Sequence, residues 1–529
     1  MSRYLSNTTL RFISYALAVL PIFIFRDFTP DNELRYLSIA DEALANGSIF
    51  TFTSHGVIYA DKPPLYLWIV MLGKVLFGHH SMLFLGMFSL LPALAMIYVM
   101  NQWVKDLLTA EERFSAELML LTSVFFVGSA VVLRMDMLMC MFIVLALYTF
   151  FRMYENKGSR FDPILFPVYV FLALFTKGPV GLIVPLVSVI TFLVLKKEYK
   201  LIRKYWGWKT LSILAFLSGI WFIGVYAEGG SEYLNNLLFK QTVNRAVNAF
   251  HHKEPFYYYF IAIWYTLAPW SLLVGAILWN FIRKHYTLSN LELFFIVIAL
   301  STIVTLSIFS SKLAVYILPT LPFFVYLSMI WLHRTAQSKW YSILMSIPSV
   351  ILILAFPATL IYKYFFKETE FVVSLPIVLA SALLTVAGTI TLKYLLSNKL
   401  LSGIQTLGAG LMASVFVVSF AIPKLNHLIG LNHLCLQAKA IADQKGGVNY
   451  YYCGLSRANN FSVYLKSELK ELKKPDLLAD DKIVTPAIVF VSGKELRKND
   501  TLKMFARGRN IFHTGNYYCI ELENKKQND

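Results

Sequence analysis

The sequence predicts an all-α polytopic membrane domain followed by a small C-terminal α/β domain. Of its 529 residues, 57% are hydrophobic and only 15% are charged, and the mean hydropathy is +0.59. This composition is too apolar for an ordinary soluble protein. Long apolar stretches recur up to about residue 423, and a more polar segment with short β-type runs follows. We therefore expect a transmembrane domain over residues 1–423 and a soluble domain over residues 424–529.

About thirteen apolar segments are long enough to cross the roughly 30 Å of a bilayer's hydrocarbon core as helices. The first follows Arg3 and Arg11 and resembles a signal sequence, but no small-residue cleavage site comes after it, so we expect an uncleaved first span. A further half-buried helix is expected over residues 65–78. The expected spans are residues 10–25, 82–104, 114–132, 138–154, 163–176, 179–195, 210–226, 257–281, 291–309, 314–332, 340–362, 371–393 and 403–422.

We attribute the net charge of +17 to basic loops that set the orientation of the chain in the membrane. Lys and Arg lie in short clusters between apolar segments rather than along one polar face, which argues against nucleic-acid binding. Nearly all of these clusters fall on one side of the membrane if the N-terminus is cytoplasmic. The expected location is the bacterial inner membrane, multi-pass, with the C-terminal domain in the periplasm. The first loop (residues 26–64) and several short polar turns then lie on the outer side.

The C-terminal domain is expected to pair short strands with a helical charged stretch over residues 456–473. The expected strands are residues 450–453, 487–491 and 517–522. Cys453 and Cys519 fall in two of them, and in an oxidising compartment either a disulfide or two unpaired buried thiols fits the sequence. The domain has no glycine-rich phosphate loop, and we assign it no chemistry.

The first loop places carboxylates and a lysine between aromatic residues. Asp31 is able to orient or deprotonate an acceptor, or to stabilise positive charge at a sugar carbon, and Lys62 is able to hold a phosphate. The alternative roles are structural. Asp31 would then cap the helix that follows it, and Lys62 would extend its ammonium group to lipid headgroups.

Ionisable residues recur at the outer ends of later spans. Asp136 follows Arg134 by two residues between apolar segments, where a charge is costly unless it faces protein or a wet cavity. An ion pair with Arg134 is the structural alternative. Lys177 and Lys312 are lone cations at similar positions, and with Arg245 they would form an anion-binding ring for a phosphate leaving group. Each of the three would otherwise be a headgroup anchor.

Two adjacent histidines, His251 and His252, lie close to a run of aromatic residues. A divalent metal would need a third ligand from another loop, and Asp61 is the available candidate. A pair of histidines in a loop is more often structural. The sequence therefore requires no cofactor, and a metal held by these three residues is the alternative.

Six segments together resemble the superfamily of lipid A aminoarabinose transferases and dolichyl-phosphate-mannose-protein mannosyltransferases. These are membrane glycosyltransferases of the GT-C type that use polyprenyl-phosphate sugars. The match is closest to the aminoarabinose transferase branch, and it depends on the order of the segments and on their sharing one side of the membrane. The segments are residues 30–36, 61–66, 134–136, 176–179, 245–259 and 311–319.

The resemblance implies roles for three residues. In that superfamily the first-loop Asp is the catalytic carboxylate, the Lys before the Pro pair binds the carrier phosphate, and the Arg-x-Asp turn supplies a second acidic residue. These roles map to Asp31, Lys62 and Asp136. The superfamily usually has Asp directly followed by Glu, three residues before the Arg, whereas Asn32 intervenes here. Asp31 and Glu33 are therefore rivals for the catalytic role.

A second departure concerns the metal. The superfamily usually has Glu before the Lys, and Asp61 stands there in this chain, which weakens the carry-over of a metal site with a loop histidine. The residues expected to bind substrate are Arg35, Tyr36, Lys62, Lys177, Arg245, Lys312 and Tyr316.

The expected activity is transfer of an aminoarabinose-like or other amino sugar from undecaprenyl phosphate to lipid A, with inversion, at the periplasmic face. The expected partners are this donor, lipid A or another acceptor, and membrane lipids, with no nucleic acid. One alternative is an enzyme similar to protein O-mannosyltransferases, with a protein or other glycan as acceptor. Another is a transporter or flippase of lipid-linked sugars. The lack of internal repeats and the long first loop favour a transferase.

Overall fold

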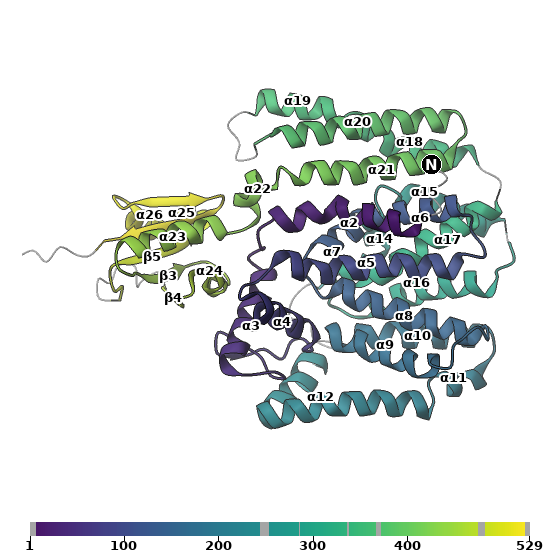
Figure 1. Cartoon of the computed structure of the whole chain (residues 1–529), viewed down its shortest axis with the longest axis horizontal. Coiled ribbons are helices and arrows are strands. Elements are labelled where there is room, and N and C mark those ends of the chain that lie inside the picture. The colour runs from purple at the N-terminus through teal and green to yellow at the C-terminus, as the bar shows by residue number, and fades with distance from the viewer. Residues whose placement is uncertain are drawn as a thin grey trace, which may run out of the picture.

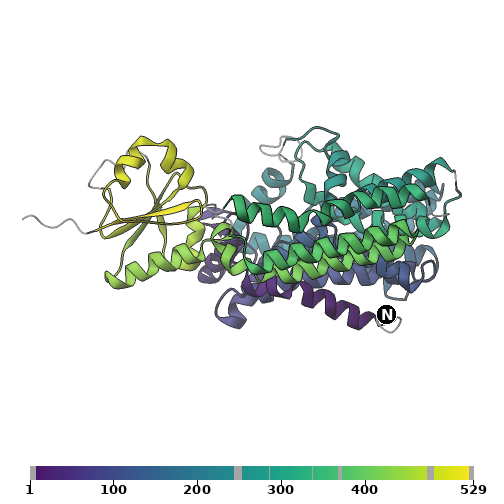
Figure 2. The same ribbon diagram turned by 90° about the horizontal axis from the view of Figure 1, so that it is seen from above.

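A helical bundle carries a small sheet domain at one end (Figure 1). This computed structural model describes residues 7–243, 253–284, 286–335, 338–366, 372–473 and 482–523. Helix α3 (Glu33–Asn46) and helix α4 (Leu65–Phe77) lie at the same end of the bundle as the sheet domain. The first described residues lie near the opposite end (Figure 2). We call the end that carries the sheet domain the domain end.

Apolar helices form the bundle. Among the described residues, nine helices are long and apolar enough to cross a membrane, or up to eleven spans if each of two bent pairs counts as one. The bundle helices are α2 (Thr8–Phe25), α5 (Met82–Val104), α6 (Ala110–Leu121), α7 (Val124–Val131), α8 (Asp136–Tyr154), α9 (Asp162–Lys177), α10 (Val180–Leu195), α11 (Tyr199–Tyr205), α12 (Trp208–Asn235), α14 (Tyr258–Thr266), α15 (Ser271–Arg283), α16 (Asn290–Ile308), α17 (Leu321–Arg334), α18 (Lys339–Ile353), α19 (Ala355–Phe365), α20 (Leu375–Leu396) and α21 (Leu400–Ser419). The π-helix η1 (Asn236–Val243) extends α12, and the 3-10 helix η2 (Ala314–Thr320) precedes α17.

Every expected span falls on one or more helices. The structure nevertheless has nine to eleven candidate spans where about thirteen were expected, for two physical reasons. The segment 114–132 is bent by 69° between α6 and α7, and the segment 257–281 is bent by 118° between α14 and α15. Helices α9 and α10 have 16 residues each, so each is about 24 Å long, less than a full hydrocarbon core. The further helix expected over residues 65–78 is α4.

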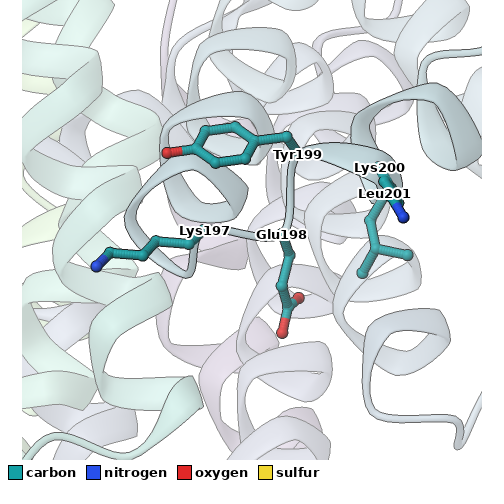
Figure 3. A pocket seen from close by; sticks show the side chains of 5 residues that line it. All are labelled: Lys197, Glu198, Tyr199, Lys200 and Leu201. Atoms are coloured by element: carbon teal, nitrogen blue, oxygen red, sulfur yellow. The ribbon is translucent and has the colours of Figure 1, made fainter.

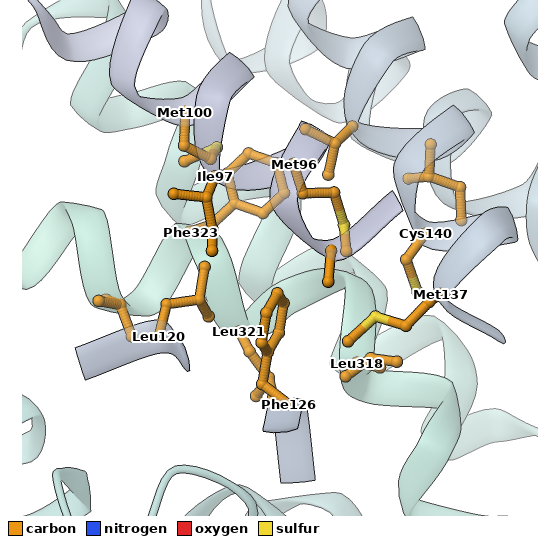
Figure 4. Packing of buried hydrophobic residues seen from close by; sticks show 14 of the residues in the cluster. Met96, Ile97, Met100, Leu120, Phe126, Met137, Cys140, Leu318, Leu321 and Phe323 are labelled. Atoms are coloured by element: carbon orange, nitrogen blue, oxygen red, sulfur yellow. The ribbon is translucent and has the colours of Figure 1, made fainter. Parts of the chain in front are cut away.

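The core of the bundle is apolar and reaches up to the domain end. Side chains of α5, α6, α7, α8, η2 and α17 pack against one another in this core (Figure 4). Met137 and Cys140 belong to this core, so Asp136, the first residue of α8, lies at the edge of the core. The labelled core residues in Figure 4 are Met96, Ile97, Met100, Leu120, Phe126, Met137, Cys140, Leu318, Leu321 and Phe323.

The first loop is tied to the end of α12. The Glu228 carboxylate accepts hydrogen bonds from three consecutive backbone N–H groups, residues 49–51. The Tyr233 hydroxyl accepts from the Phe52 N–H at 3.1 Å and donates to the Tyr59 carbonyl oxygen at 2.8 Å. Because extended loop backbone needs partners for its polar groups, these two side chains fix the path of the loop just before Asp61.

The sheet domain has five strands, β3 (Asn449–Cys453), β4 (Leu469–Glu471), β5 (Ala487–Ser492), β6 (Ile511–Thr514) and β7 (Tyr517–Leu522). Their order is β4-β3-β5-β7-β6, parallel from β4 to β5 and antiparallel from β5 to β6. Helix α23 (Asn432–Gln444) covers one face, and α25 (Gly493–Lys498) with α26 (Asp500–Ala506) lies on the other (Figure 2). Helix α22 (Ile422–Ile429) connects the domain to the bundle. The separate two-stranded ladder of β1 (Thr53–Ser54) and β2 (Val57–Ile58) belongs to the first loop.

The expected strands are present, but the helix expected over residues 456–473 is wrong. That stretch forms the 3-10 helix η3 (Ala458–Phe461), the short helix α24 (Ser462–Leu465) and strand β4. Arg457 and Lys466 adopt positive φ angles of 60° and 56°, a left-handed conformation that ends helices. A charged composition favours a helix here, but it does not reveal these two breaks.

Cys453 and Cys519 are not bonded to each other. Cys453 packs in the core cluster beneath α26, whereas Cys519 packs with Cys435 in the cluster beneath α23. Because the two clusters lie on opposite faces of the sheet, a disulfide between Cys453 and Cys519 would have to cross it. Of the two alternatives that the sequence left open, buried thiols hold.

Candidate active site at the domain end of the bundle

An ion-paired carboxylate lies at the start of α8. The Asp136 side chain is 2% exposed, and its Oδ2 lies 3.0 Å from the Arg134 Nε. The Lys177 ammonium forms a second ion pair with Asp136 Oδ1. Local structure favours this arrangement, because Asp136 begins α8 and Lys177 ends α9, where their charges complement the helix dipoles. The packing of α8 against α9 brings the two helix ends together.

A tyrosine from a third element completes this arrangement. The Lys177 ammonium lies 4.6 Å from the centre of the Tyr316 ring, which η2 supplies. A cation above an aromatic face at this distance is attracted by the ring quadrupole. Lys177 is therefore held from two sides, by a carboxylate and by an aromatic ring.

The first loop contributes further charges. The Lys62 ammonium lies 3.4 Å from Asp61 and close enough to Asp136 to attract its carboxylate. The Arg35 guanidinium lies 5.4 Å from the Tyr36 ring centre and 5.7 Å from the Tyr59 ring centre, and it also attracts Asp61.

Tyr36 lies within electrostatic range of both Arg35 and Asp136. Burial raises the pKa of Tyr36. The nearby Arg35 cation lowers this pKa in part, whereas the Asp136 carboxylate raises it further. The phenol therefore stays protonated and able to donate a hydrogen bond.

These side chains form what we call the charged cluster. It contains more cations than carboxylates, and all are partly or fully buried. In a poorly solvated place such an excess attracts an anion much more strongly than it would in water. The Arg35 Nε is buried and has no hydrogen-bond partner among the described residues, which leaves one donor for a ligand. The members are Arg35, Asp61, Lys62, Arg134, Asp136 and Lys177.

Glu33 lies beside the charged cluster, but both oxygens of its carboxylate are already used in hydrogen bonds. Both of its oxygens accept from the Arg26 guanidinium, at 2.9 and 2.7 Å. The Thr29 N–H donates at 2.7 Å and the Leu133 N–H at 2.8 Å. With its side chain 0% exposed, Glu33 joins the end of α2, the first loop and the segment before Arg134. These contacts describe a positioning residue.

Asp31 lies at the rim, where the bundle meets the sheet domain. Its backbone carbonyl accepts a 2.8 Å hydrogen bond from Arg457 Nη1. The side chain is exposed and forms no hydrogen bond or ion pair with the residues that the structure describes. The helix-capping alternative is wrong, because α3 begins at Glu33 with Asn32 as its N-cap, and no side chain caps it.

Lys312 does not join the charged cluster. It is 3% exposed, and its ammonium donates to the carbonyl oxygens of Glu254 at 2.9 Å and Phe309 at 2.6 Å. These bonds account for its burial by holding the turn before η2. The expected anion ring thus loses one member, and Arg245 lies outside the described residues.

The described residues do not make up the expected metal site. His251 and His252 lie outside them, and Asp61 is paired with Lys62. No group of three His, Cys, Asp or Glu side chains in the described part of the chain is arranged to hold a metal ion. A metal bound by Asp61 and the two histidines stays a prediction.

Contacts from the sheet domain are the part of the site that the sequence did not indicate. Besides Arg457, the Asn460 Nδ2 reaches the Pro30 carbonyl oxygen at 3.5 Å, and its Oδ1 lies 3.3 Å from His55 Nε2. Residues this far from the first loop along the chain carry no local signal of such contacts.

A hollow of about 330 Å³ lies at the other end of the bundle, beside the start of α11 (Figure 3). It is lined by five consecutive residues, 197–201. Their side chains diverge in Figure 3 instead of converging on one point. A binding site normally has convergent polar groups from several elements, and the charged cluster meets that description better.

The chain resembles known proteins in both sequence and fold. Residues 61–222 match the family model described as dolichyl-phosphate-mannose-protein mannosyltransferase. An uncharacterized protein of Aquifex aeolicus is 28% identical over 340 residues, 64% of this chain and 65% of that protein. The undecaprenyl phosphate-alpha-4-amino-4-deoxy-L-arabinose arabinosyl transferase of an Enterobacter species is 25% identical over 302 residues, 56% of this chain and 54% of that protein. The matched segment thus spans less than two thirds of either relative.

Structural similarity covers nearly the whole chain. The crystal structure of ArnT from Cupriavidus metallidurans bound to undecaprenyl phosphate superposes with a TM-score of 0.75 at 18% identity, over 97% of this chain and 98% of that one. Its apo structure gives a TM-score of 0.72. The chain therefore has this multi-pass membrane fold, including the small C-terminal sheet domain. The family-model match and the sequence relatives relate the chain to the aminoarabinose transferase and protein mannosyltransferase superfamily.

Proposed function

We propose that this protein is a membrane glycosyltransferase that moves an aminoarabinose-like sugar from undecaprenyl phosphate to lipid A. The charged cluster is the observation that carries the proposal, because it offers cations to a phosphate at the boundary of an apolar core. The matched relatives, one of them an undecaprenyl phosphate-aminoarabinose transferase, support the same choice of donor.

The charge change in the reaction suits this cluster. A sugar-phosphate donor is a phosphodiester with one negative charge. When the acceptor oxygen bonds to the anomeric carbon, the bond from that carbon to the phosphate oxygen breaks and the phosphate leaves with the electron pair. The product, a phosphomonoester, carries more negative charge. Cations fixed in place around it stabilise this developing charge without reorganising. In the proposed mechanism Lys62, Arg35 and Lys177 hold the phosphate, and direct displacement inverts the anomeric centre.

The carboxylates take different roles in the proposal. Asp136 is ion-paired on both oxygens, which makes it a poor proton acceptor and suits it to fixing Lys177 and Arg134. Asp31 is exposed at the rim and keeps its carboxylate available. It would orient the acceptor and stabilise positive charge at the sugar carbon, and it would act as general base toward a hydroxyl acceptor. A phosphate acceptor is already anionic and needs little such help.

The domain end is proposed to face the periplasm. Short basic loops mark the cytoplasmic side of membrane proteins. The densest such group in this chain surrounds α11, at the end of the bundle opposite the sheet domain (Figure 1). Nucleotide sugars are not available on the periplasmic side, so a donor carried by a lipid phosphate would be needed there. The group comprises Lys196, Lys197, Lys200, Arg203, Lys204 and Lys209.

A protein acceptor is the second candidate, since residues 61–222 match the mannosyltransferase family model. This candidate uses the same donor chemistry and the same charged cluster, and it differs only in what approaches Asp31.

Mass spectrometry of lipid A tests the proposal directly. Cells would express the wild-type chain, Asp31→Asn, or the control Asp500→Asn, which alters an exposed carboxylate of α26. We expect a glycosyl mass increment on lipid A with the wild type and the control but not with Asp31→Asn at equal membrane expression. An unmodified lipid A in all three strains, with new glycosylation on secreted proteins, would replace the lipid A acceptor by a protein.

A further inference from the structure

One carboxylate, Asp27, joins the end of α2 to the sheet domain. Its Oδ1 accepts a hydrogen bond from the Tyr464 hydroxyl of α24, and its Oδ2 accepts from the Asn432 N–H of α23 at 2.8 Å. The Asp27 N–H in turn donates to the Asn426 Oδ1 of α22 at 3.0 Å. Three elements that follow the last bundle helix, α21, therefore converge on a residue just after α2.

The contact at Asp27 leaves no room for a side chain at Gly430. A Cβ at position 430 would lie 2.1 Å from the Asp27 Oδ2 and 2.4 Å from its Cγ. The φ of Gly430 is −135°, which any residue adopts, so the close approach and not the backbone conformation accounts for the glycine. The segment before α23 is thus shaped to fit the Asp27 carboxylate.

Tyr464 packs in both parts of the protein. Its ring contacts the core of the bundle and the cluster beneath α23, and the adjacent Val463 belongs to the bundle core. Burial raises the pKa of Tyr464, and the Asp27 carboxylate raises it further. The hydroxyl therefore stays protonated, and its hydrogen bond to a carboxylate is stronger than one between neutral groups.

The sheet domain holds the first loop a second time, close to Asp31. Arg457 donates to the Asp31 carbonyl oxygen at 2.8 Å, and Asn460 donates to the Pro30 carbonyl oxygen at 3.5 Å. Together with Asp27, these contacts fix the backbone of residues 27–31. The Asp31 side chain stays exposed, so the fixed segment presents its carboxylate at the rim.

We propose that Asp27 is a positioning residue, through which the sheet domain docks on the first loop and holds the Asp31 carboxylate in place for the acceptor. The role of Asp31 in this statement rests on the proposed function. Because Tyr464, Asn432 and Asn426 meet at one residue, loss of a single contact there loosens both the domain and the rim.

Two variants remove the contact in different ways. Tyr464→Phe deletes the hydroxyl and keeps the ring that packs in both cores. Its control is Tyr518→Phe, the same chemical change on β7, where the ring packs on the opposite face of the sheet. Gly430→Ala displaces the Asp27 carboxylate without altering it. Its control is Gly219→Ala, because a Cβ at position 219 meets nothing within 4 Å.

Hydrogen–deuterium exchange of the full-length protein in nanodiscs tests the docking without any sugar transfer. We expect exchange in residues 27–36 and 432–436 to be about tenfold faster in Tyr464→Phe and Gly430→Ala than in their controls, because a hydrogen bond to a charged group is lost. Binding of undecaprenyl phosphate, measured by isothermal titration, should stay unchanged, since Asp27 is not part of the charged cluster.

Steady-state transfer to the acceptor tests the positioning. Tyr464→Phe should lower kcat about tenfold and leave the donor KM unchanged. The double variant with Arg457→Ala should lose little more than the stronger single variant, because both contacts dock the same domain and their effects are coupled.

Three outcomes would overturn the inference. Exchange in both variants equal to that in their controls would show that Asp27 does not dock the domain. Faster exchange with an unchanged kcat would remove the positioning role. Multiplied losses in the double variant would show that the contacts at Asp27 and Asp31 act independently. Exchange needs neither donor nor acceptor, so a wild type that leaves lipid A unmodified would count against the proposed function and not against the docking.

Discussion

The Arg457 guanidinium of the sheet domain donates a 2.8 Å hydrogen bond to the backbone carbonyl oxygen of Asp31, 426 residues earlier in the chain. The left-handed backbone of Arg457, with φ of 60°, directs the chain into η3 at this point. The sheet domain therefore helps to fix the position of the exposed carboxylate.

Removing this contact should slow the proposed transfer. A hydrogen bond from a charged donor contributes about 1.5 kcal/mol or more, so we expect Arg457→Ala to lower kcat about tenfold with little change in KM for the donor. The measurement is a steady-state assay in nanodiscs. Arg497→Ala changes an exposed arginine of α25 and is the control. A loss confined to donor KM would contradict a positioning role.

Glu33 and Asp31 should respond differently to removal of their charge. The Glu33 side chain is 0% exposed and accepts four hydrogen bonds, and uncoupling it from Arg26 leaves a largely buried cation without its carboxylate. We expect Glu33→Gln to cost about 3 kcal/mol of folding free energy and to reduce the yield of monodisperse protein. Asp31→Asn should fold normally and lose transfer. Normal folding of Glu33→Gln together with complete inactivity would make Glu33 the catalytic carboxylate instead.

Lys177 and Lys312 form a matched pair for testing the phosphate site. Lys177 contacts Asp136 and Tyr316, whereas Lys312 contacts two backbone carbonyl oxygens. Lys177→Met should weaken donor binding about tenfold, because a charge-assisted contact to phosphate is lost. Lys312→Met should lower the melting temperature and leave donor affinity of the folded protein unchanged. Isothermal titration with a polyprenyl phosphate measures the first effect, and equal losses of affinity in both variants would count against the charged cluster.

Glu42 should make the stability of the first loop depend on acid pH. Burial alone would raise the pKa of Glu42, but hydrogen bonds from the Thr53 hydroxyl and the N–H groups of Gly56 and His55 outweigh it and hold the pKa below the ordinary 4.5. A depressed pKa in the folded state stabilises the fold above the unfolded value, and this stabilisation is lost as the pH falls through the folded pKa.

Melting temperatures recorded from neutral pH down to about pH 3 test this linkage. We expect the wild type to lose stability below about pH 4.5, and Glu42→Gln to begin less stable at neutral pH and to change less on acidification. Parallel curves for the two proteins would show that Glu42 does not contribute.

The length of the apolar segments predicted the helices of the bundle, and lone charges beside those segments predicted two members of the charged cluster, Asp136 and Lys177. Each expected span falls on a helix because a long apolar run has few alternatives in a bilayer. The 118° bend between α14 and α15 was not predicted, because the hydrophobicity of a segment does not show whether its helix is straight or bent. Asp136 and Lys177 were indicated because unpaired charges beside apolar segments are costly.

The partners of Glu33 and Asp31 could not be read from the sequence. The backbone N–H of Leu133 carries no residue-specific signal, and Arg457 lies in a domain with no recognisable motif. Only the tertiary fold determines that Glu33 is buried and that Asp31, two residues earlier, is exposed.

Hydrogen bonds attach the first loop to α12, so the two move together. Glu228 and Tyr233, which flank Gly230 in α12, hydrogen-bond to residues 49–59 of the loop. At Gly230 the helix backbone adopts a φ of 65°. Only two residues separate Tyr59 from Lys62. A tilt of the last turns of α12 about Gly230 would therefore also displace Lys62, the lysine proposed to hold the carrier phosphate.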